Sequence, residues 1–236
     1  MDSSDEMGLK AQLVNKHIGQ ILSGVLSPGT RLPSEREIAE SLQISRSVVR
    51  EGLSELAAIG FLSIEARKGT YVNDWLKDGN LLMLNAICKA GLQLPLNLLR
   101  GLLSLRMDTL CDSAGKSALL RTDDDLDVMQ NILEEQATLD YKQNEDFARL
   151  DFLYHKQIYI SSGNAFYPIL FNSVRELHFS LAFFFYRNLI DKSQIRELHM
   201  RMLYALIEQN PTAAAGWTRL ALEMGNRILD RSIFDN

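Results

Sequence analysis

Residues 28–72 read PGTRLPSEREIAESLQISRSVVREGLSELAAIGFLSIEARKGTYV, and this stretch decides the fold of the first third of the chain. It contains two short helical patterns that are separated by a tight turn. Ser34, followed three residues later by Glu37, predicts a capping box at the start of the first pattern. Ser45 is an N-cap residue for the second pattern. Gly60 is placed to end that helix in a left-handed conformation.

A two-stranded hairpin is predicted directly after these helices. Residues 61–65 alternate as a strand does, residues 66–69 form a turn with a basic tip, and residues 70–72 return. A further helix is expected before Pro28-Gly29. Three helices followed by such a hairpin form a winged helix-turn-helix, which fits into DNA grooves, so the stretch predicts double-stranded DNA as a partner.

The DNA contacts are predicted from the first turn of the recognition helix, the helix before it and the hairpin tip. The first turn of a recognition helix reaches base edges, and arginine can grip guanine or phosphate through two hydrogen bonds. An exposed arginine taken alone is usually solvated surface, but several on this scaffold favour DNA contact. The predicted DNA-binding residues are Arg36, Arg46, Ser47, Arg50, Arg67, Lys68 and Gly69.

The overall charge gives this prediction only weak support. The chain carries a formal net charge of −5, and residues 1–75 hold eight Lys and Arg against ten Asp and Glu. The positive charge must therefore be focused on one face, and binding must rest on a few arginines with a steep salt dependence. A homodimer would double those contacts.

The composition predicts an intracellular chain of two domains. With 236 residues, of which 46% are hydrophobic, the chain can build two cores. Cys88 and Cys111 have neither metal-pair spacing nor a disulfide framework around them, so we expect buried thiols in a reducing cytoplasm. No apolar run reaches the roughly 20 residues that span a membrane, and residues 1–6 do not resemble a secretion signal.

From residue 74 on, strand signals nearly vanish. One helix is expected over 74–90, broken by Gly91 and Pro95. Thr122, followed by three aspartates, is a strong start signal for a later helix. Further helices are expected over 95–121, 144–161, 165–190, 192–209 and 212–231. The predicted fold is therefore mainly α, with a winged helix-turn-helix over 1–73, a linker helix over 74–94 and an antiparallel α-helical bundle over 95–236.

Two sets of residues carry a resemblance to known regulators. In the winged segment they are Pro28-Gly29, Leu32-Pro33-Ser34-Glu35-Arg36, Ser45-Arg46, Val49-Arg50-Glu51, Leu53, Leu56, Gly60 and Gly69-Thr70-Tyr71-Val72. By these the segment resembles the GntR family of bacterial transcription regulators. The bundle is similar to the C-terminal domain of the FadR subfamily through Leu103-Ser104-Leu105-Arg106, Asp151-Phe152-Leu153-Tyr154-His155, Ser162-Gly163-Asn164 and Glu197-Leu198-His199.

The resemblance implies a ligand-responsive regulator of a metabolic operon. Such a protein binds an inverted-repeat operator as a homodimer and holds a small-molecule effector in its helical bundle. The resemblance also implies that Arg36, Arg46, Arg50 and the wing turn contact DNA.

Three residues of the bundle predict a site for one divalent metal ion. Asp151 and His155 are four residues apart and share a helix face, and His199 can supply a third ligand from another helix. Imidazole and carboxylate suit zinc, nickel or manganese. The resemblance implies a further histidine near position 221, where this chain has Ala221. The alternative is that the histidines are hydrogen-bonded core or surface residues without a metal.

Two effectors are compatible with the sequence. Arg106 can clamp the carboxylate of a small organic acid, with Asp151, His155 and His199 lining the same cavity; in the alternative, Arg106 forms a structural pair with Asp108 or Glu176. The second hypothesis is an acyl-CoA or a fatty acid, held by an aromatic-rich helix that contains residues 183–186. Such aromatic residues are usually core, and the acyl-CoA regulator of the subfamily should offer basic residues where Phe183 and Phe184 stand.

The rival classes of function are an enzyme and an architectural DNA protein. A metal on Asp151, His155 and His199 would activate water in a metal-dependent enzyme fused to a DNA-binding domain. No nucleophile elbow, phosphate loop or paired catalytic carboxylates accompany these residues in the sequence, so we predict no enzymatic activity. An architectural protein would have a fully packed bundle without a cavity.

Overall fold

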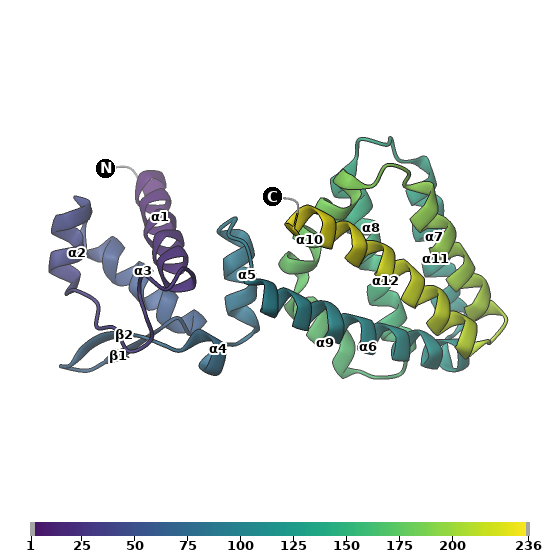
Figure 1. Cartoon of the computed structure of the whole chain (residues 1–236), viewed down its shortest axis with the longest axis horizontal. Coiled ribbons are helices and arrows are strands. Elements are labelled where there is room, and N and C mark those ends of the chain that lie inside the picture. The colour runs from purple at the N-terminus through teal and green to yellow at the C-terminus, as the bar shows by residue number, and fades with distance from the viewer. Residues whose placement is uncertain (1–2, 235–236) are drawn as a thin grey trace. The chain divides into compact units, whose positions relative to one another are not determined.

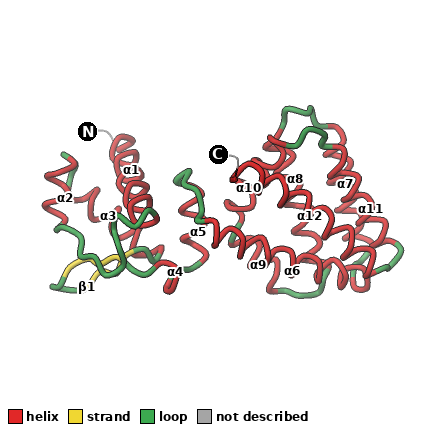
Figure 2. Tube along the Cα trace, viewed as in Figure 1, coloured by secondary structure: helices red, strands yellow, loops and turns green. Residues whose placement is uncertain are grey.

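The structure is a computed structural model that describes residues 3–234, with side chains from residue 8 to residue 229. The chain divides into two compact units, Met1–Pro95 and Leu96–Asn236. Both are built mainly of helices, and the first also contains the one small sheet of the described residues (Figures 1 and 2). The predicted fold class is therefore confirmed.

The first unit begins with the winged helix-turn-helix that the sequence predicted. Its elements are α1 (Ser3–Leu22), α2 (Glu35–Leu42), α3 (Arg46–Ile59), β1 (Leu62–Glu65) and β2 (Gly69–Val72). The two strands pair antiparallel, with Leu62 opposite Val72 and Glu65 opposite Gly69. The three helices and the hairpin appear in the expected order.

The local start and stop signals in this unit act as expected. The Ser34 side chain accepts a hydrogen bond from the backbone of Glu37, whose carboxylate accepts in turn from the backbone of Ser34. The Ser45 hydroxyl accepts from the backbone of Val48 at the start of α3. Gly60 ends α3 with a φ of 106°, a left-handed conformation that glycine adopts without strain.

Close packing of α1 on α3 positions the recognition helix. A methyl group at Gly52 would lie 2.7 Å from Leu13 Cδ2, so the absence of a side chain lets α1 approach. The core behind the two helices contains the fully buried Val49, Leu56 and Phe61. The polar face of α3 is left exposed, as a DNA-reading helix requires.

The segment after the wing differs from the prediction. In place of one helix over 74–94, the structure has α4 (Trp75–Asp78) and α5 (Leu81–Lys89), so the expected single linker helix is wrong. The backbone is extended at Gly79 and Asn80, and the Asn80 side chain caps α5 by accepting from the backbone of Leu82. Asn80 also donates 2.9 Å to the backbone oxygen of Ile59, which ties the segment to the end of α3.

The described residues of the second unit form seven helices. They are α6 (Leu96–Leu120), α7 (Asp123–Thr138), α8 (Asn144–Ser161), α9 (Phe166–Ser173), α10 (Arg175–Asn188), α11 (Ser193–Ile207) and α12 (Pro211–Phe234). Helix α8 is buried on most of its surface and contacts α6, α7, α9 and α10. The helix expected over 165–190 is two helices that meet at Val174, a break that no glycine or proline marks. No described helix is long and apolar enough to cross a bilayer.

The capping box at the start of α7 gives a test of the bundle's local stability. The Thr122 hydroxyl accepts from the backbone of Asp125, whose carboxylate accepts from the backbone of Thr122. We expect Thr122→Ala to lower the free energy of unfolding by about 1 kcal/mol, because the exposed end of α7 loses an acceptor. The denaturant midpoint of the bundle measures this, followed by Trp217 fluorescence in a Trp75→Phe background. Thr122→Ser keeps the hydroxyl and should leave the midpoint unchanged.

Candidate functional site

The predicted DNA-reading residues lie on the exposed face of α3. Arg46 is the first residue of α3, and Arg50 lies one turn later; both are exposed. Among the described residues, Arg46 has no ion-pair partner. The hydroxyl of Ser47 donates to Glu51 over 3.4 Å, which places it beside Arg46 on the solvent side of the helix.

Three of the predicted basic residues have an acidic neighbour. Arg50 lies 3.0 Å from Glu35 across the turn between α2 and α3, Arg36 lies 3.6 Å from Glu40 and Lys68 lies 3.1 Å from Glu65. All three pairs are exposed to solvent, where an ion pair contributes roughly 0–1 kcal/mol. A phosphate or a base edge can therefore replace the carboxylate at little cost.

The wing tip brings together a residue that the sequence analysis named and one that it missed. Arg67 adopts a left-handed φ of 64° and is exposed. At Gly69, a methyl group would lie 2.8 Å from the Arg31 Nε atom. Arg31 also forms an isolated bridge with Tyr71, so a third basic side chain lies against the wing. Its position directly before the matched Leu32 was the only signal for it.

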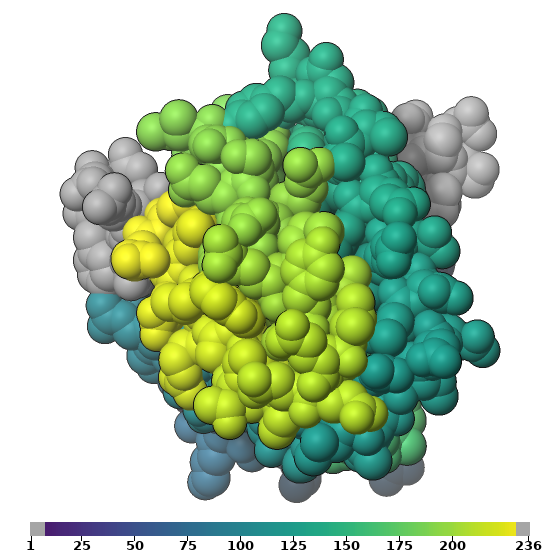
Figure 3. Space-filling view, turned by 90° about the vertical axis from the view of Figure 1, so that its right-hand side faces the viewer, coloured from purple at the N-terminus to yellow at the C-terminus, as the bar shows by residue number. Residues whose placement is uncertain are grey.

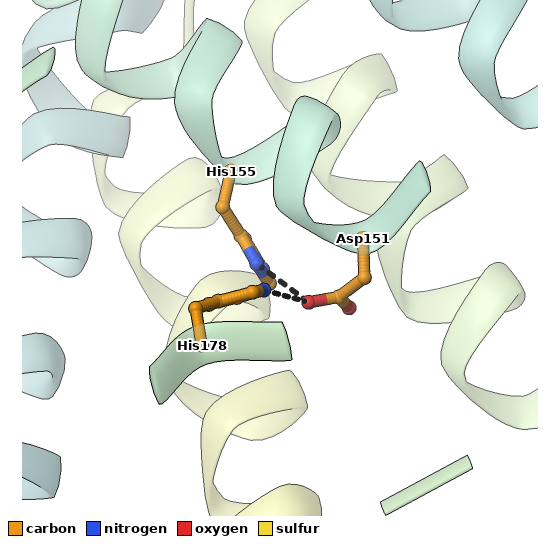
Figure 4. A group of neighbouring side chains, drawn as sticks. All are labelled: Asp151, His155 and His178. Atoms are coloured by element: carbon orange, nitrogen blue, oxygen red, sulfur yellow. Dashed lines mark hydrogen bonds and ion pairs between the residues drawn. The ribbon is translucent and has the colours of Figure 1, made fainter. Parts of the chain in front are cut away.

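The second candidate site is a cluster of polar side chains buried in the bundle. Asp151 and His155 come from α8, His178 from α10 and His199 from α11, and none of the four is more than 5% exposed. The chain contains four histidines in all, so three of them gather around one carboxylate. Figure 4 shows three members of the cluster, with the rings of His155 and His178 directed at the carboxylate of Asp151.

The distances in this cluster are those of direct contact. His155 Nδ1 and His178 Nε2 each lie 3.0 Å from Asp151 Oδ2. One ligand atom from each of the three residues lies within 4.8 Å of the other two, a grouping that can hold a metal ion. His199 is slightly farther away, with its Nε2 atom 4.0 Å from Asp151 Oδ1.

Arg106 reaches the same cluster from α6. Its Nη2 atom lies 3.2 Å from His155 Nδ1 and 3.8 Å from Asp151 Oδ2, while its buried Nε atom has no hydrogen-bond partner among the described residues. The nearest acid is therefore Asp151 and not Asp108 or Glu176. The structure thus brings together all four residues predicted to bind the effector.

Two buried tyrosines hold the cluster in place. The Tyr186 hydroxyl donates to Asp151 Oδ1 over 3.1 Å, and Gln136 donates to the same hydroxyl over 3.5 Å. The Tyr154 hydroxyl donates 2.8 Å to the backbone oxygen of His199, and its ring stacks on the His199 ring at 4.6 Å between centroids. Such supporting contacts fix the orientation of the groups that face a ligand.

Burial and mutual contact shift the pKa values of the cluster. Burial raises the pKa of the Asp151 carboxyl, but the attraction of His155 and the hydrogen bonds from His155 and His178 outweigh it and hold the pKa well below its usual range. Burial lowers the pKa of His178 to about 4 and that of His199 to about 3. Both rings are therefore neutral near pH 7, and each keeps one nitrogen lone pair for a proton or a metal.

A small cavity adjoins the cluster. Its volume is about 30 Å³, which is room for one or two water molecules or an ion. Arg106, Asp151, His155 and His199 form its polar wall, and Leu181, Ala182, Phe185, Ile195, Ala221, Leu222, Gly225 and Leu229 form the apolar wall. Ala221, where the resemblance implied a histidine, faces this cavity with a methyl group only.

A larger groove lies on the surface, between α7 and α11. These helices lie side by side on the face of the bundle drawn in Figure 3, and the groove between them has a volume of about 680 Å³. Its charged lining mixes Glu134 and Glu197 with Arg196. The buried polar groups converge at the central cavity and not at this groove, which makes the cavity the better candidate for a specific site.

His178 is the residue of the cluster that the sequence analysis missed. The expected helix over 165–190 did not include the break at Val174, so the inward face of α10 was not assigned. The signal was present in the spacing, because His178, Ala182, Phe185 and Leu189 are all buried and follow helical periodicity.

Two family descriptions match the chain and together cover nearly all of it. "Bacterial regulatory proteins, gntR family" matches residues 10–72, and "FadR C-terminal domain" matches residues 73–229. The chain belongs to the GntR family, FadR subfamily. It is a DNA-binding transcription regulator with a C-terminal effector-binding domain, a class that is generally not enzymatic.

Curated relatives agree with this assignment. The HTH-type transcriptional regulator LutR of Bacillus subtilis is 33% identical over 157 residues, which are 66% of this chain and 69% of LutR. The fatty acid metabolism regulator protein of Serratia proteamaculans is 30% identical over 171 residues, which are 72% of this chain and 70% of that protein.

Solved structures share the fold over nearly the whole chain. Lar of Listeria monocytogenes matches with a TM-score of 0.58 and 17% identity, covering 94% of this chain and 97% of Lar. McbR/YncC of E. coli matches with a TM-score of 0.52 and 20% identity, covering 99% and 100% of the two chains. At these identities the likeness concerns the fold alone.

The two buried tyrosines allow the charge of Asp151 to be tested. In Tyr186→Phe the Asp151 Oδ1 atom loses its donor, so we expect a loss of about 1.5–3 kcal/mol in the free energy of unfolding, as for hydrogen bonds to charged groups. Tyr154→Phe removes a bond to a neutral carbonyl and should cost only about 0.5–1.5 kcal/mol. Denaturant midpoints, followed as for Thr122, measure both. Equal losses would show that no buried charge depends on Tyr186.

Proposed function

We propose that this regulator binds an inverted-repeat operator as a homodimer and controls a metabolic operon in response to a small organic acid. The observation that carries the effector assignment is the buried contact of Arg106 with Asp151 and His155 beside a cavity in the bundle. A guanidinium with a buried, unpartnered Nε atom is a ready partner for a carboxylate, because its planar fork matches two oxygens.

The DNA-binding surface that we propose combines α3 with the wing. Arg46 and Arg50 read base edges or phosphates, Arg36 contacts the backbone from α2, and Ser47 contributes beside them. The wing tip, Arg67 to Gly69, reaches the adjacent groove or phosphates. Support comes from the exposure of these side chains at the start of α3 and at the wing. Two such surfaces in a dimer supply the contacts that a chain of net charge −5 needs to hold a polyanion.

The apolar area for a dimer contact is available on the bundle. Leu119 and Leu120 at the end of α6, and Phe166 and Ile169 in α9, are each more than half exposed. The aromatic residues 183–186 of α10 are buried or half-buried and offer little exposed area for such a contact. We therefore place the dimer contact on the bundle but outside the aromatic segment of α10.

The effector hypothesis has a second candidate, favoured by a relative's name. The Serratia protein is called a fatty acid metabolism regulator, which keeps an acyl chain or acyl-CoA under consideration. The cavity of about 30 Å³ is far smaller than an acyl chain, and its polar wall carries an arginine, an aspartate and two histidines. A small anion fits this chemistry better, whether Asp151, His155 and His199 act as its hydrogen-bonding wall or as ligands of a metal. We propose no catalytic role for these residues.

The DNA assignment predicts two kinds of loss. Arg46→Ala and Arg50→Ala should each weaken operator binding by about 1–3 kcal/mol and relax the sequence preference, as loss of a bidentate base contact does. Lys68→Ala should weaken binding to all sequences alike. Fluorescence anisotropy with duplexes that carry one or two inverted half-sites measures both effects.

A matched control for these variants is Lys16→Ala, which removes one positive charge from the outer face of α1 in the same unit. It should leave operator affinity unchanged. Normal operator binding by the double variant Arg46→Ala/Arg50→Ala would contradict the placement of the reading face. Equal affinity for one and two half-sites would contradict the dimeric mode.

The effector assignment predicts a separation of DNA binding from its regulation. Small organic acids are first screened for those that raise the melting temperature and alter operator affinity. Arg106→Gln should then bind the operator normally but lose the response, because the acid loses its cationic partner. Arg149→Gln, which removes an exposed charge paired with Glu135, is the control and should respond as the parent does. If Arg106→Gln still responds fully, Arg106 is structural.

A further inference from the structure

Arg31 lies along the flank of the wing, outside the reading face on α3. It belongs to the segment between α1 and α2, which runs beside β2 on the edge away from β1. The amide of Leu32 donates 2.8 Å to the backbone oxygen of Thr70, and Arg31 itself pairs with Tyr71. The backbone of Arg31 is therefore fixed relative to the wing, whereas its side chain is exposed.

Gly69 provides the surface on which the guanidinium of Arg31 lies. A methyl group at Gly69 would lie 2.8 Å from the Nε atom of Arg31 and 3.4 Å from its Cζ and Nη2 atoms. The guanidinium therefore contacts the bare backbone of the wing, where a side chain would displace it. Gly69 has a φ of 129°, which other residues rarely adopt. The conformation of the turn thus requires glycine, and the missing side chain leaves a slot for Arg31.

No carboxylate forms an ion pair with Arg31 in the described part of the chain. Three of the basic residues proposed above to contact DNA each pair with a glutamate. Hydrogen bonds from Ser34 chiefly lower the pKa of the Glu37 carboxyl, and the charge of Arg31 contributes only weakly. An exposed guanidinium without an acidic partner can bind an external anion and gives up no ion pair when it does so.

We propose that Arg31, held against Gly69, binds a phosphate of the DNA backbone at the rim of the groove that the wing enters. The inference rests on the proposed DNA-binding surface and adds a contact from the flank of the wing. The planar fork of a guanidinium matches two phosphate oxygens. Because the backbone of Arg31 is already fixed by its pairing with β2, binding orders little more than the side chain itself.

The position of the guanidinium favours a phosphate over a base edge. Its Nε atom lies against Gly69, the first residue of β2, whereas Arg67 lies in the turn at the tip. Base edges lie at the floor of a groove that is roughly 8 Å deep, so a side chain held at the flank meets the phosphates at the rim first. Phosphate contacts position a protein on the duplex and carry no sequence information directly. Arg31 therefore sets the affinity of the wing and not its sequence preference.

The experiment measures the salt dependence of DNA binding by the full-length protein. A duplex is recovered by affinity selection from a random-sequence library, and a scrambled duplex of the same composition is the non-specific probe. Anisotropy titrations between about 50 and 200 mM salt give the slope of log K against log salt concentration. We expect Arg31→Gln to make this slope shallower by about 0.9 for each bound subunit. Binding to both duplexes should weaken by the same factor, on the order of tenfold at 0.1 M salt.

Two further variants separate a phosphate contact from a structural role. Arg31→Lys keeps the charge but loses the fork, so it should keep the parental slope with an affinity between those of the parent and Arg31→Gln. Lys16→Ala removes a charge from the outer face of α1 and should change neither quantity. A lowered melting temperature of Arg31→Gln with an unchanged slope would show that Arg31 only braces the wing. A changed ratio of affinities for the two duplexes would show a base contact instead. Either result overturns the proposal.

Arg46→Ala, measured on the same two duplexes, distinguishes failure of this contact from failure of the proposed surface. If Arg46→Ala weakens binding to the selected duplex while Arg31→Gln keeps the parental slope and affinity, the Arg31 contact is wrong and the surface stands. If both variants bind as the parent does, the surface is wrong, and the Arg31 contact with it.

Discussion

A buried carboxylate at the centre of the bundle is the constraint on which the effector domain depends. Moving an ionised carboxylate out of water is strongly unfavourable unless charges and hydrogen bonds replace the solvent. For Asp151 these come from Arg106 on α6, His155 on α8 and both His178 and Tyr186 on α10. The relative positions of three helices are thus fixed by one side chain. The contacts that hold these helices together are consequently the same contacts that we propose for ligand recognition.

The DNA-binding unit uses charge in the opposite way. Its ion pairs, such as Arg50 with Glu35, lie at the surface, where solvent screening makes them weak. In the absence of DNA these glutamates partly neutralise the proposed reading face, which would reduce non-specific attraction to phosphate. A correct site must offer each arginine a better partner than its glutamate. An acidic chain thereby gains discrimination and loses little affinity, provided that the contacts are multiplied by a second subunit.

Features specified by neighbouring residues could be predicted from the sequence, whereas those set by tertiary contacts could not. The capping boxes at Ser34 and Thr122 and the stop at Gly60 involve partners within a few residues, and all three are present. The pairing of Asp151 with His155 is likewise local. The break at Val174 has no glycine or proline to mark it. Because the break was not predicted, the buried face of α10, on which His178 lies, was not assigned. The contact of His178 with Asp151 on α8 arises only when the helices of the bundle pack together, so the sequence alone does not reveal it.

In the function proposed above, the position of the cavity within the bundle sets how a bound acid would act on the DNA unit. An acid larger than the cavity of about 30 Å³ must enlarge it. The wall formed by Ala221 and Gly225 on α12 offers the least side-chain bulk against such an enlargement. Helix α12 packs along α6, and α6 carries Arg106. This helix begins at Leu96, directly after the boundary of the first unit at Pro95. Ten residues of helix, a rise of about 15 Å, separate Arg106 from that boundary, so one continuous helix joins the proposed effector site to the end of the first unit.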